Sequence, residues 1–315
     1  MQCILHPDDL QNNNSTFSGF SEENVMSVDP RGFKSFLQSE ADTFLEEEQV
    51  RLNSTVSVIS YTEGGVRVAL TDGQTLTADY VICTFSLGVL QHQDVQFQPP
   101  LPLWKREAIH SMNMGVYTKI FLQFPYKFWF DTETGLYADR ERGRYPIWES
   151  LDHPNYFPGS GILFCTVTGA FSRRISTLPT AILQNELLSV LSSMFPPINT
   201  TLPDGTTVPS TIPEPIAMHF HSWNDDPLFR GSYANWPPAF LAEHHANLRA
   251  DLQGRDEMLK AGVDHLRLDV LGYLQGAYFE GQDIGMNVAE CIQAGGCLGL
   301  EHVELVKNAR PYDIV

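Results

Sequence analysis

The sequence lacks the features of a membrane-embedded chain and those of a small disulfide-framed one. No apolar run in its 315 residues reaches the roughly 20 residues that cross a bilayer, and no signal peptide is visible at Met1. Five cysteines do not make a disulfide framework. Charged residues are 18% of the chain and hydrophobic residues 43%, which is an ordinary globular composition. A chain of this length exceeds one usual core, so we expect two lobes.

Positive charge is also scarce, because the formal net charge is −18 at pH 7. An acidic surface repels nucleic acid and draws cations toward the protein by long-range steering. We therefore expect no nucleic-acid partner. The sign of the charge favours a cationic partner, although an acidic surface also simply aids solubility.

The sequence gives opposite indications about location, because the cysteines and the glycosylation sequons favour one answer and the missing leader another. Cys83 and Cys165 stand in apolar strand-like runs and are interpreted as core thiols, whereas Cys291 and Cys297 are spaced so that they could bridge. Four Asn-x-Ser/Thr sequons begin at Asn13, Asn14, Asn53 and Asn199. The sequons and the bridge favour a secreted protein. The lack of a visible leader points the other way, so the location stays open.

The clearest strand in the chain runs from Gly115 to Trp129, GVYTKIFLQFPYKFW. Positions 116, 118, 120, 122 and 124 share one face, and positions 117, 119, 121 and 123 share the other. Lys119 falls between Tyr117 and Phe121 on a face that otherwise looks half-buried. Burying an ammonium is costly, so this lysine is paired, reaches water or has a lowered pKa. The pattern alone leaves two interpretations open, a snorkelling lysine on an edge strand and a functional group.

This strand, with Phe128 and Trp129 after it, resembles the flavin-dependent amine oxidase family, most closely the polyamine oxidases and fungal members in particular. Five other segments agree in order and spacing, so the resemblance covers roughly residues 20–297. These segments are VDPRGF at 28–33, RLN at 51–53 with Val56 and Ile59, DYVICTFSLGVL at 79–90, RGSYANWP at 230–237 and GYLQGAYFEG at 272–281.

The resemblance assigns roles to three residues at a substrate site. Lys119 matches the family's catalytic lysine, which holds a water against the flavin N5 and can carry protons there. Tyr233 and Tyr273 match two aromatic rings on either side of the substrate slot, whose faces tolerate a cation. From the residues alone, Tyr233 is equally a turn residue and Tyr273 a packed core tyrosine. A small cationic amine or polyamine is the substrate that the resemblance implies, with neither nucleic acid nor membrane as a partner.

The resemblance also implies FAD as cofactor and marks the residues that would contact it. Small residues at the start of a helix let its N-terminus approach the flavin ring closely. The implied cofactor-binding residues are Val56, Thr84, Phe85, Trp223, Trp236, Gly272, Leu274, Gly276 and Ala277. Trp223 and Trp236 are equally interpreted as plain core aromatics.

Two motifs that the family uses to hold FAD are missing from the sequence. No Gly-x-Gly-x-x-Gly occurs, although relatives carry it near the N-terminus for the pyrophosphate. Relatives also carry an apolar strand ending in Gly-Glu or Gly-Thr-Glu before the Gly-Tyr motif. Here residues 254–269 are charged and look more like a helix. The resemblance therefore implies a truncated chain that begins inside the family's fold.

Apolar periodicity predicts a mixed α/β (α+β) protein with helices and strands interspersed. We expect helices at 31–45, 104–112, 179–194, within 238–252 and at 274–293, the last interrupted by Gly281 and Gly285. Further strands are expected at 50–52, 56–61, 66–70, 145–149, 161–167 and 216–223, with 78–85 as a strand covered on both faces. His219 and His221 alternate along one of these strands without a convincing third metal ligand.

By resemblance, residues 28–98 and 223–300 form an incomplete FAD-binding lobe, interleaved with a substrate lobe of mixed sheet and helices at 99–222. Segments 1–27 and 301–315 flank these lobes. Two functions follow. One is FAD-dependent oxidation of amines, with hydride removal next to nitrogen, imine hydrolysis and reduction of oxygen to hydrogen peroxide. The other is a catalytically inactive remnant that has lost FAD. A different amine or amino-acid substrate is a third option.

Overall fold

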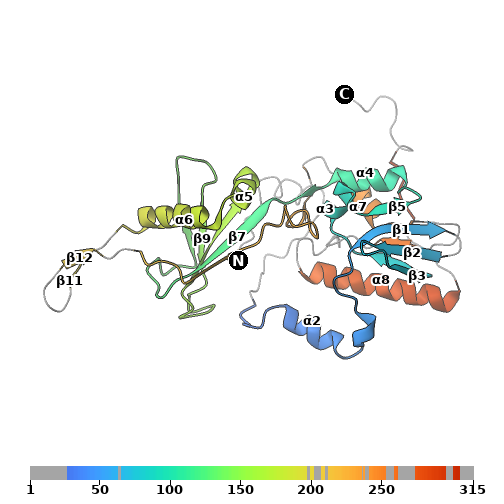
Figure 1. The fold of residues 1–315 in the computed structure, drawn as a ribbon, viewed down its shortest axis with the longest axis horizontal. Helices are drawn as coiled ribbons and strands as arrows, with labels where there is room; N and C mark the ends of the chain where they lie inside the picture. Colours follow the sequence, from blue (N-terminus) through green and yellow to red (C-terminus); the bar gives the residue numbers. More distant parts are fainter. Residues whose placement is uncertain are drawn as a thin grey trace, which may run out of the picture. The chain divides into compact units, whose positions relative to one another are not determined.

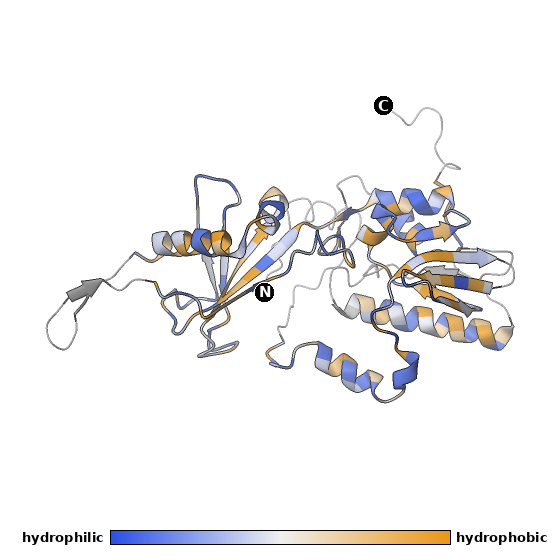
Figure 2. Cartoon of the chain, viewed as in Figure 1, coloured by the Kyte–Doolittle hydropathy of each residue, from blue (hydrophilic) through white to orange (hydrophobic). Residues whose placement is uncertain are grey.

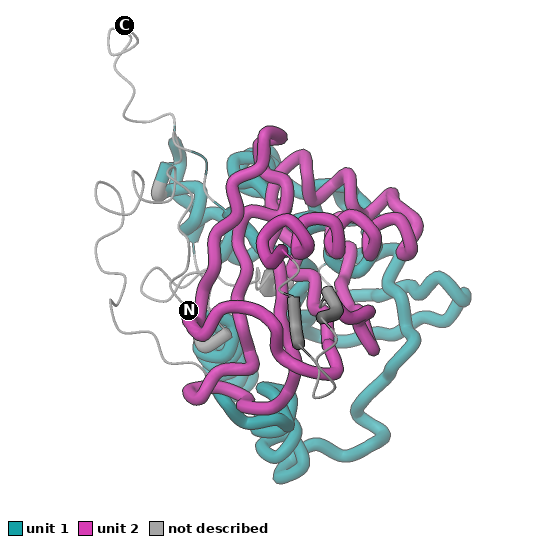
Figure 3. Tube along the Cα trace, turned by 90° about the vertical axis from the view of Figure 1, so that its left-hand side faces the viewer, with its two compact units in different colours: residues 1–114, 227–315 teal, residues 115–226 magenta. Residues whose placement is uncertain are grey.

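The computed structural model describes residues 27–62, 65–196, 199–201, 207–209, 212–235, 237, 241–252, 259–261, 274–295 and 301–305. The chain divides into two compact units, one of residues 1–114 and 227–315 and the other of residues 115–226 (Figures 1 and 3). We call them unit 1 and unit 2 and describe each by itself. Helices and strands mix in both, which confirms the predicted fold class.

Unit 2 contains a five-stranded sheet in the order β13-β7-β10-β9-β8. The described elements are β7 (Tyr117–Gln123), β8 (Thr134–Leu136), β9 (Ile147–Ser150), β10 (Ile162–Thr168), α5 (Gly169–Ser176), α6 (Thr180–Met194), β11 (Asn199–Thr201), β12 (Thr207–Pro209) and β13 (Ala217–Phe220). All four neighbouring strand pairs in this sheet are antiparallel, where a mixed sheet was expected. The connections β8–β9 and β9–β10 join neighbouring strands, which makes those pairs antiparallel.

Helices α5 and α6 pack against one face of this sheet and form the core of unit 2 with it. Ile120 and Leu122 of β7, Trp148 of β9 and Leu163 of β10 are fully buried there. The helices contribute the buried side chains Phe171, Ile175, Leu183, Leu187, Val190 and Leu191. Each fully buried aliphatic or aromatic side chain contributes roughly 1.5–3 kcal/mol of transfer free energy. The predicted helices on one side of this sheet are therefore present.

Unit 1 is built on a four-stranded sheet in the order β3-β2-β1-β5, in which β1 pairs parallel with β5 and antiparallel with β2. The described strands of unit 1, in this sheet and outside it, are β1 (Val56–Thr62), β2 (Gly65–Leu70), β3 (Thr75–Ala78), β4 (Val81–Cys83), β5 (Gln96–Gln98), β6 (Asn113–Met114), β14 (Ala234–Asn235) and β15 (Leu259–Ala261). Its helices are α2 (Lys34–Ala41), the 3₁₀ turn η1 (Glu47–Gln49), α3 (Leu87–His92), α4 (Leu103–Ser111), α7 (Ala242–Arg249) and α8 (Leu274–Ala294). The mixed sheet is thus the one in unit 1.

Several predicted boundaries are wrong. The run 78–85 forms only the short strand β4, and Ile82 within it is 41% exposed, so it is not covered on both faces. Residues 50–52 are not a strand, and α2 is shorter than the predicted 31–45. Within 254–269, the described residues Leu259–Ala261 form a strand parallel to β4 rather than a helix. Helix α8 continues through Gly281 and Gly285, because tertiary packing outweighs the low helix propensity of glycine.

The predicted lobe boundary at residue 99 also differs from the observed division. Helix α4 and strand β6 belong to unit 1, because α4 packs on α3 and α7 and β6 pairs with β14. Cys83 and Cys165 are buried free thiols, as expected, and burial raises the pKa of both. Cys291 is disulfide-bonded, and Cys297, its predicted partner, lies outside the described residues.

Helix α2 has the predicted amphipathic pattern but buries none of its residues. Phe36 and Leu37 in α2, and Phe33 and Phe44 beside it, are between 38% and 68% exposed. A hydrogen bond of 2.8 Å from the hydroxyl of Tyr278 to Glu40 Oε1 joins α8 to α2. Figure 2 shows the alternating apolar and polar bands along both helices.

A buried lysine joins α4 to the end of α7. Lys105 is 2% exposed, and its Nζ donates hydrogen bonds to the carbonyls of Asn247, Leu248 and Ala250 at 3.0, 2.6 and 2.7 Å. The last carbonyls of a helix have no partner within the helix, so the lysine supplies the missing donors. Burial lowers the pKa of Lys105 to about 7, and the charge of Asp251 opposes this shift.

The segment 227–233, which leads into β14, is held against α3 and its flanking residues. Arg230 donates two hydrogen bonds to the carboxylate of Asp94 at 2.8 and 3.1 Å, which holds the pKa of Asp94 below its usual value. Ser86 caps α3 by accepting from the Val89 N–H at 3.2 Å, and its hydroxyl donates to the carbonyl of Phe229 at 2.5 Å. The position of this segment is therefore fixed by the ion pair of Arg230 and by the hydrogen bond to the backbone carbonyl of Phe229.

Glycine at position 88 is what lets this segment approach α3. A Cβ on Gly88 would lie 2.6 Å from Arg230 Cβ, 2.6 Å from Arg230 O and 2.7 Å from Phe229 O. Because two of these atoms belong to the backbone, a larger residue cannot be accommodated by rotating one side chain.

We expect Lys105→Met to lower the free energy of unfolding at pH 7 by about 2–4 kcal/mol, because it leaves three buried carbonyls without a donor. Urea denaturation followed by circular dichroism measures this loss. Lys127→Met is the control, because Lys127 pairs with the fully exposed Asp131 at 3.0 Å and such pairs contribute below about 1 kcal/mol. Equal losses in the two variants would contradict the capping role.

The stability contributed by Lys105 should also depend on pH. Below pH 7 the amine is protonated in both the folded and the unfolded chain. Between about 7 and the ordinary value of 10.5, the unfolded chain keeps a proton that the folded protein has released. The free energy of unfolding of the wild type should therefore rise with pH relative to Lys105→Met across that window. A constant difference from pH 6 to pH 9 would show that the pKa is not lowered.

We expect Gly88→Ala to lower the free energy of unfolding by roughly 1–3 kcal/mol, because the added methyl group forces the 227–233 segment away from α3. Gly281→Ala is the matched control, since nothing lies within 4 Å of a Cβ there. In that helix interior, alanine should stabilise by about 0.5–1 kcal/mol. If thermal unfolding shows the same sign for both variants, the close approach at Gly88 is not a constraint.

Candidate functional site

Lys119 lies at the centre of β7, on the half-buried side of the strand. Thr118, Ile120 and Leu122 are buried, while the residues that alternate with them are half-buried, which confirms the predicted two faces. Strand β7 pairs with β10 on one side and β13 on the other, so Lys119 is not on an edge strand. The interpretation as a snorkelling edge lysine is therefore wrong.

The sheet face that carries Lys119 is the one opposite α5 and α6. Lys119 pairs across the strands with Thr166, which in turn pairs with Ile147 of β9. Phe164 and Glu149 form the neighbouring pair on the same face. Among the described residues of β7, β9 and β10, this face therefore carries one cation and one carboxylate among aromatic, aliphatic and uncharged polar side chains.

An aromatic ring positions the amine of Lys119. The Nζ atom lies 4.3 Å from the centroid of the Phe164 ring, within the range of a cation–π interaction. Phe164 is itself 2% exposed and packs on Phe121, with ring centroids 5.0 Å apart. These two rings support the lysine side chain along the sheet surface. The sequence placed Phe121 beside Lys119 on one face of β7, whereas Phe164 was not identified, because only the strand register brings it to Lys119.

Thr166, directly opposite Lys119, was also not identified from the sequence. Its side chain is 4% exposed, and Oγ1 has no hydrogen-bond partner among the residues that the structure describes. Buried hydroxyl groups nearly always have a partner, so this atom requires an explanation.

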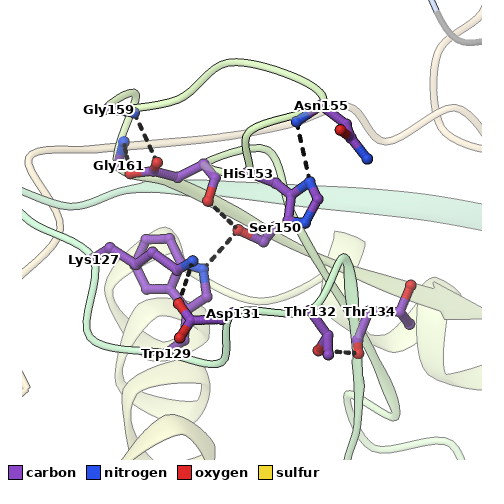
Figure 4. Close-up of polar contacts among 11 residues, drawn as sticks. Lys127, Trp129, Asp131, Thr132, Thr134, Ser150, His153, Asn155, Gly159 and Gly161 are labelled. Carbon is purple, nitrogen blue, oxygen red and sulfur yellow. Dashed lines mark hydrogen bonds and ion pairs between the residues drawn. The ribbon is translucent and has the colours of Figure 1, made fainter.

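The connection between β9 and β10 is fixed by a polar network (Figure 4). Ser150 Oγ accepts from Trp129 Nε1 at 2.8 Å and donates to the carbonyl of Asp152 at 3.0 Å. The carboxylate of Asp152 accepts the backbone N–H groups of Gly159 and Gly161 at 2.7 and 3.0 Å. Because these groups are hydrogen-bonded to one another, the network fixes the conformation of the connection. It thereby also fixes the register between β9 and β10.

Tyr233 ends the 227–233 segment of unit 1, and its side chain is 39% exposed. The Asp94–Arg230 pair and the tight packing at Gly88 fix the segment just before it. Tyr273, the second predicted ring, lies outside the described residues. Lys119 belongs to unit 2 and Tyr233 to unit 1. The assembly of the three predicted substrate-site residues thus stays a prediction.

The predicted cofactor residues fall in different parts of the chain. Val56 and Phe85 pack against one core cluster of unit 1, and Thr84 between β4 and α3 is exposed. Trp223 belongs to unit 2, where its ring lies 4.2 Å from that of His221. His221, which alternates with His219 in the sequence, contacts Asp226 through its Nε2 atom at 2.8 Å. Trp236 and Gly272 lie outside the described residues.

The first turn of α8 has features that suit the flavin ring of FAD. The helix begins at Leu274, and its first turn includes the buried Gly276 and the half-buried Ala277. The first backbone N–H groups of a helix have no partner within it and favour an anionic group. The sequence has no Gly-x-Gly-x-x-Gly for the pyrophosphate. Among the described residues, the start of α8 is thus the part that fits the ring end of FAD.

Comparisons with known proteins agree with the resemblance. The profile of the family described as flavin containing amine oxidoreductase matches residues 9–284. Polyamine oxidase 7 of Oryza sativa subsp. japonica is 37% identical over 277 residues, which are 84% of this chain and 55% of that protein. Polyamine oxidase 6 of the same plant is 36% identical over 293 residues, with 90% and 55% covered. The chain spans about half the length of these relatives.

A solved structure of a putrescine oxidase mutant, from a redesign of its cofactor binding, has a TM-score of 0.65 with 17% identity. It matches 82% of this chain and 53% of that one, and at this identity the likeness concerns the fold alone. The family match, in contrast, covers most of the sequence. The chain therefore belongs to the flavin containing amine oxidoreductases, an oxidoreductase family whose cofactor is FAD.

Proposed function

We propose that this chain takes part in the FAD-dependent oxidation of amines, of the polyamine oxidase type. The observation that carries the proposal is Lys119, a half-buried lysine on an interior strand, whose amine lies over the Phe164 ring on the sheet face opposite α5 and α6. Cations are rarely placed on such a face without a function. The polyamine oxidases among the relatives and the net charge of −18, which attracts polycations, support the same substrate class.

In this proposal unit 2 is the substrate lobe and unit 1 a partial FAD-binding lobe. Bound FAD would supply the two-electron chemistry that removes hydride from the carbon next to nitrogen and reduces oxygen to hydrogen peroxide. The start of α8, with Gly276 and Ala277, would hold the ring end of the cofactor. Lys119 would donate a hydrogen bond to a water near the reacting carbon and carry protons there. Tyr233 and Tyr273 would form the walls that admit an extended amine.

Finer assignments are also proposals. A closer relation to fungal members than to the plant relatives rests on the motif resemblance alone. A secreted location rests on the four sequons, of which Asn53 is exposed in the structure, as a glycan acceptor must be. Loss of mass on treatment of the natural protein with an N-glycosidase would test the location.

The alternative from another class is an amine-binding chain without redox activity. It differs from the oxidase in holding no FAD, because a pyrophosphate without a helix N-terminus and backbone donors loses much of its affinity. The absorption spectrum of the purified protein distinguishes the two functions. Purified protein that keeps flavin absorption bands after addition of FAD and desalting is expected for the oxidase. A colourless protein that still binds spermidine in calorimetry would establish the alternative.

For the flavin-loaded protein we expect Lys119→Met to slow flavin reduction or its reoxidation by oxygen at least tenfold, while amine binding changes less than about threefold. Stopped-flow absorbance of the flavin measures both half-reactions. Lys127→Met, which removes a surface amine of the same unit, is the control. Unchanged half-reactions in Lys119→Met would remove this lysine from the mechanism.

A further inference from the structure

The buried hydroxyl of Thr166 is the strongest unassigned feature near Lys119. Thr166 is 4% exposed, and its Oγ1 has no hydrogen-bond partner among the described residues. It stands directly opposite Lys119 in the β7–β10 pairing, so both side chains project from the same sheet face. Side chains in such a pair have Cβ atoms about 5 Å apart. The hydroxyl and the lysine therefore share one environment.

The surroundings of Thr166 contain few protein groups that could pair with its hydroxyl. The next residue across the sheet is Ile147, and the neighbour on the same face of β10 toward the Lys119 amine is Phe164. The backbone of Thr166 is paired with both β7 and β9 and is occupied by those ladders. A buried hydroxyl in such a place is strongly unfavourable unless a small polar molecule pairs with it.

A buried threonine on the other side of the same sheet provides the comparison. Thr118 is 3% exposed, and its hydroxyl bonds to Ser172 Oγ at 2.8 Å. Where a threonine hydroxyl points into the core of this unit, the fold thus supplies a partner. On the face that carries Lys119, no described residue does so for Thr166.

We propose that Thr166 Oγ1 binds one water molecule, which is shared with the amine of Lys119. A buried water needs two to four polar partners. The lysine donates to the water oxygen, and the water donates to the threonine oxygen. The amine would hold the water against the sheet, and the hydroxyl would fix its orientation. Thr166 is thus a positioning residue that acts through this water. Its part in amine oxidation rests on the proposed function, whereas the water site itself does not.

Two substitutions separate the hydroxyl from the shape of the side chain. Thr166→Val keeps the branched volume and removes the hydroxyl, and Thr166→Ser keeps the hydroxyl. In high-resolution crystal structures we expect a water within hydrogen-bond distance of both Oγ1 and Lys119 Nζ in the wild type. The same water should persist in Thr166→Ser and be missing in Thr166→Val. A wild type without this water, or a valine variant that retains it, overturns the proposal.

Thermal unfolding gives a second measurement that needs no flavin. If the hydroxyl is paired through a bound water, Thr166→Val should lower the Tm by about 2–4 °C. Thr118→Val, which loses a known hydrogen bond, is the positive control, and Thr168→Val at the exposed end of β10 is the negative control. A truly unpaired hydroxyl would instead give an unchanged or higher Tm on replacement by valine, which would overturn the proposal.

In flavin-loaded protein, we expect Thr166→Val to slow the flavin half-reaction that depends on Lys119 about tenfold, and Thr166→Ser to restore it to within about twofold. In a Lys119→Met background, Thr166→Val should add no further loss, because the shared water is already displaced. Independent, multiplying losses would overturn the shared water. If the protein remains colourless, the proposed function fails, while the crystal structures and the Tm values still decide the water site.

Discussion

The backbone register between β7 and β10 is the constraint on which the candidate site depends. It places Lys119 opposite Thr166 and Phe121 opposite Phe164, and it sends Ile120 to the other face, into the core. A slip of one residue would exchange the two faces and bury the lysine among aliphatic side chains. The hairpin network around Ser150 keeps β9 and β10 in step, so this register is supported from both sides of β10.

Unit 1 depends on a different principle, the pairing of backbone groups that short helices leave without a partner inside the helix. Lys105 supplies donors to the end of α7, and Ser86 both caps α3 and receives the 227–233 segment through the Phe229 carbonyl. Short helices are marginal by themselves, so such contacts decide where they stop. Through Ser86 and Arg230 they also position the segment that carries Tyr233. Local capping chemistry is therefore directly coupled to a predicted substrate residue.

The sequence predicted those features in which local pattern and tertiary structure agree. The alternation around Lys119 and the helix at 180–194 were correct, because in each the periodicity reports a single buried face. The expectation for 78–85 was wrong, because strand propensity does not guarantee pairing with neighbouring strands. Among the described residues, β4 pairs with the three residues of β15 alone. Thr166 reads as an ordinary strand threonine. Its relation to Lys119 arises from a pairing between distant segments, which no local pattern contains.

The uncovered side of α2 sets a requirement for handling the protein. Phe33, Phe36 and Phe44 present aromatic surface to solvent, and such patches promote self-association. The charge of −18 opposes it by keeping copies apart. That repulsion is screened beyond about 8 Å at physiological ionic strength, whereas apolar attraction is not. Solubility should therefore decline as salt is added, and a buffer of low ionic strength should keep copies of the chain apart.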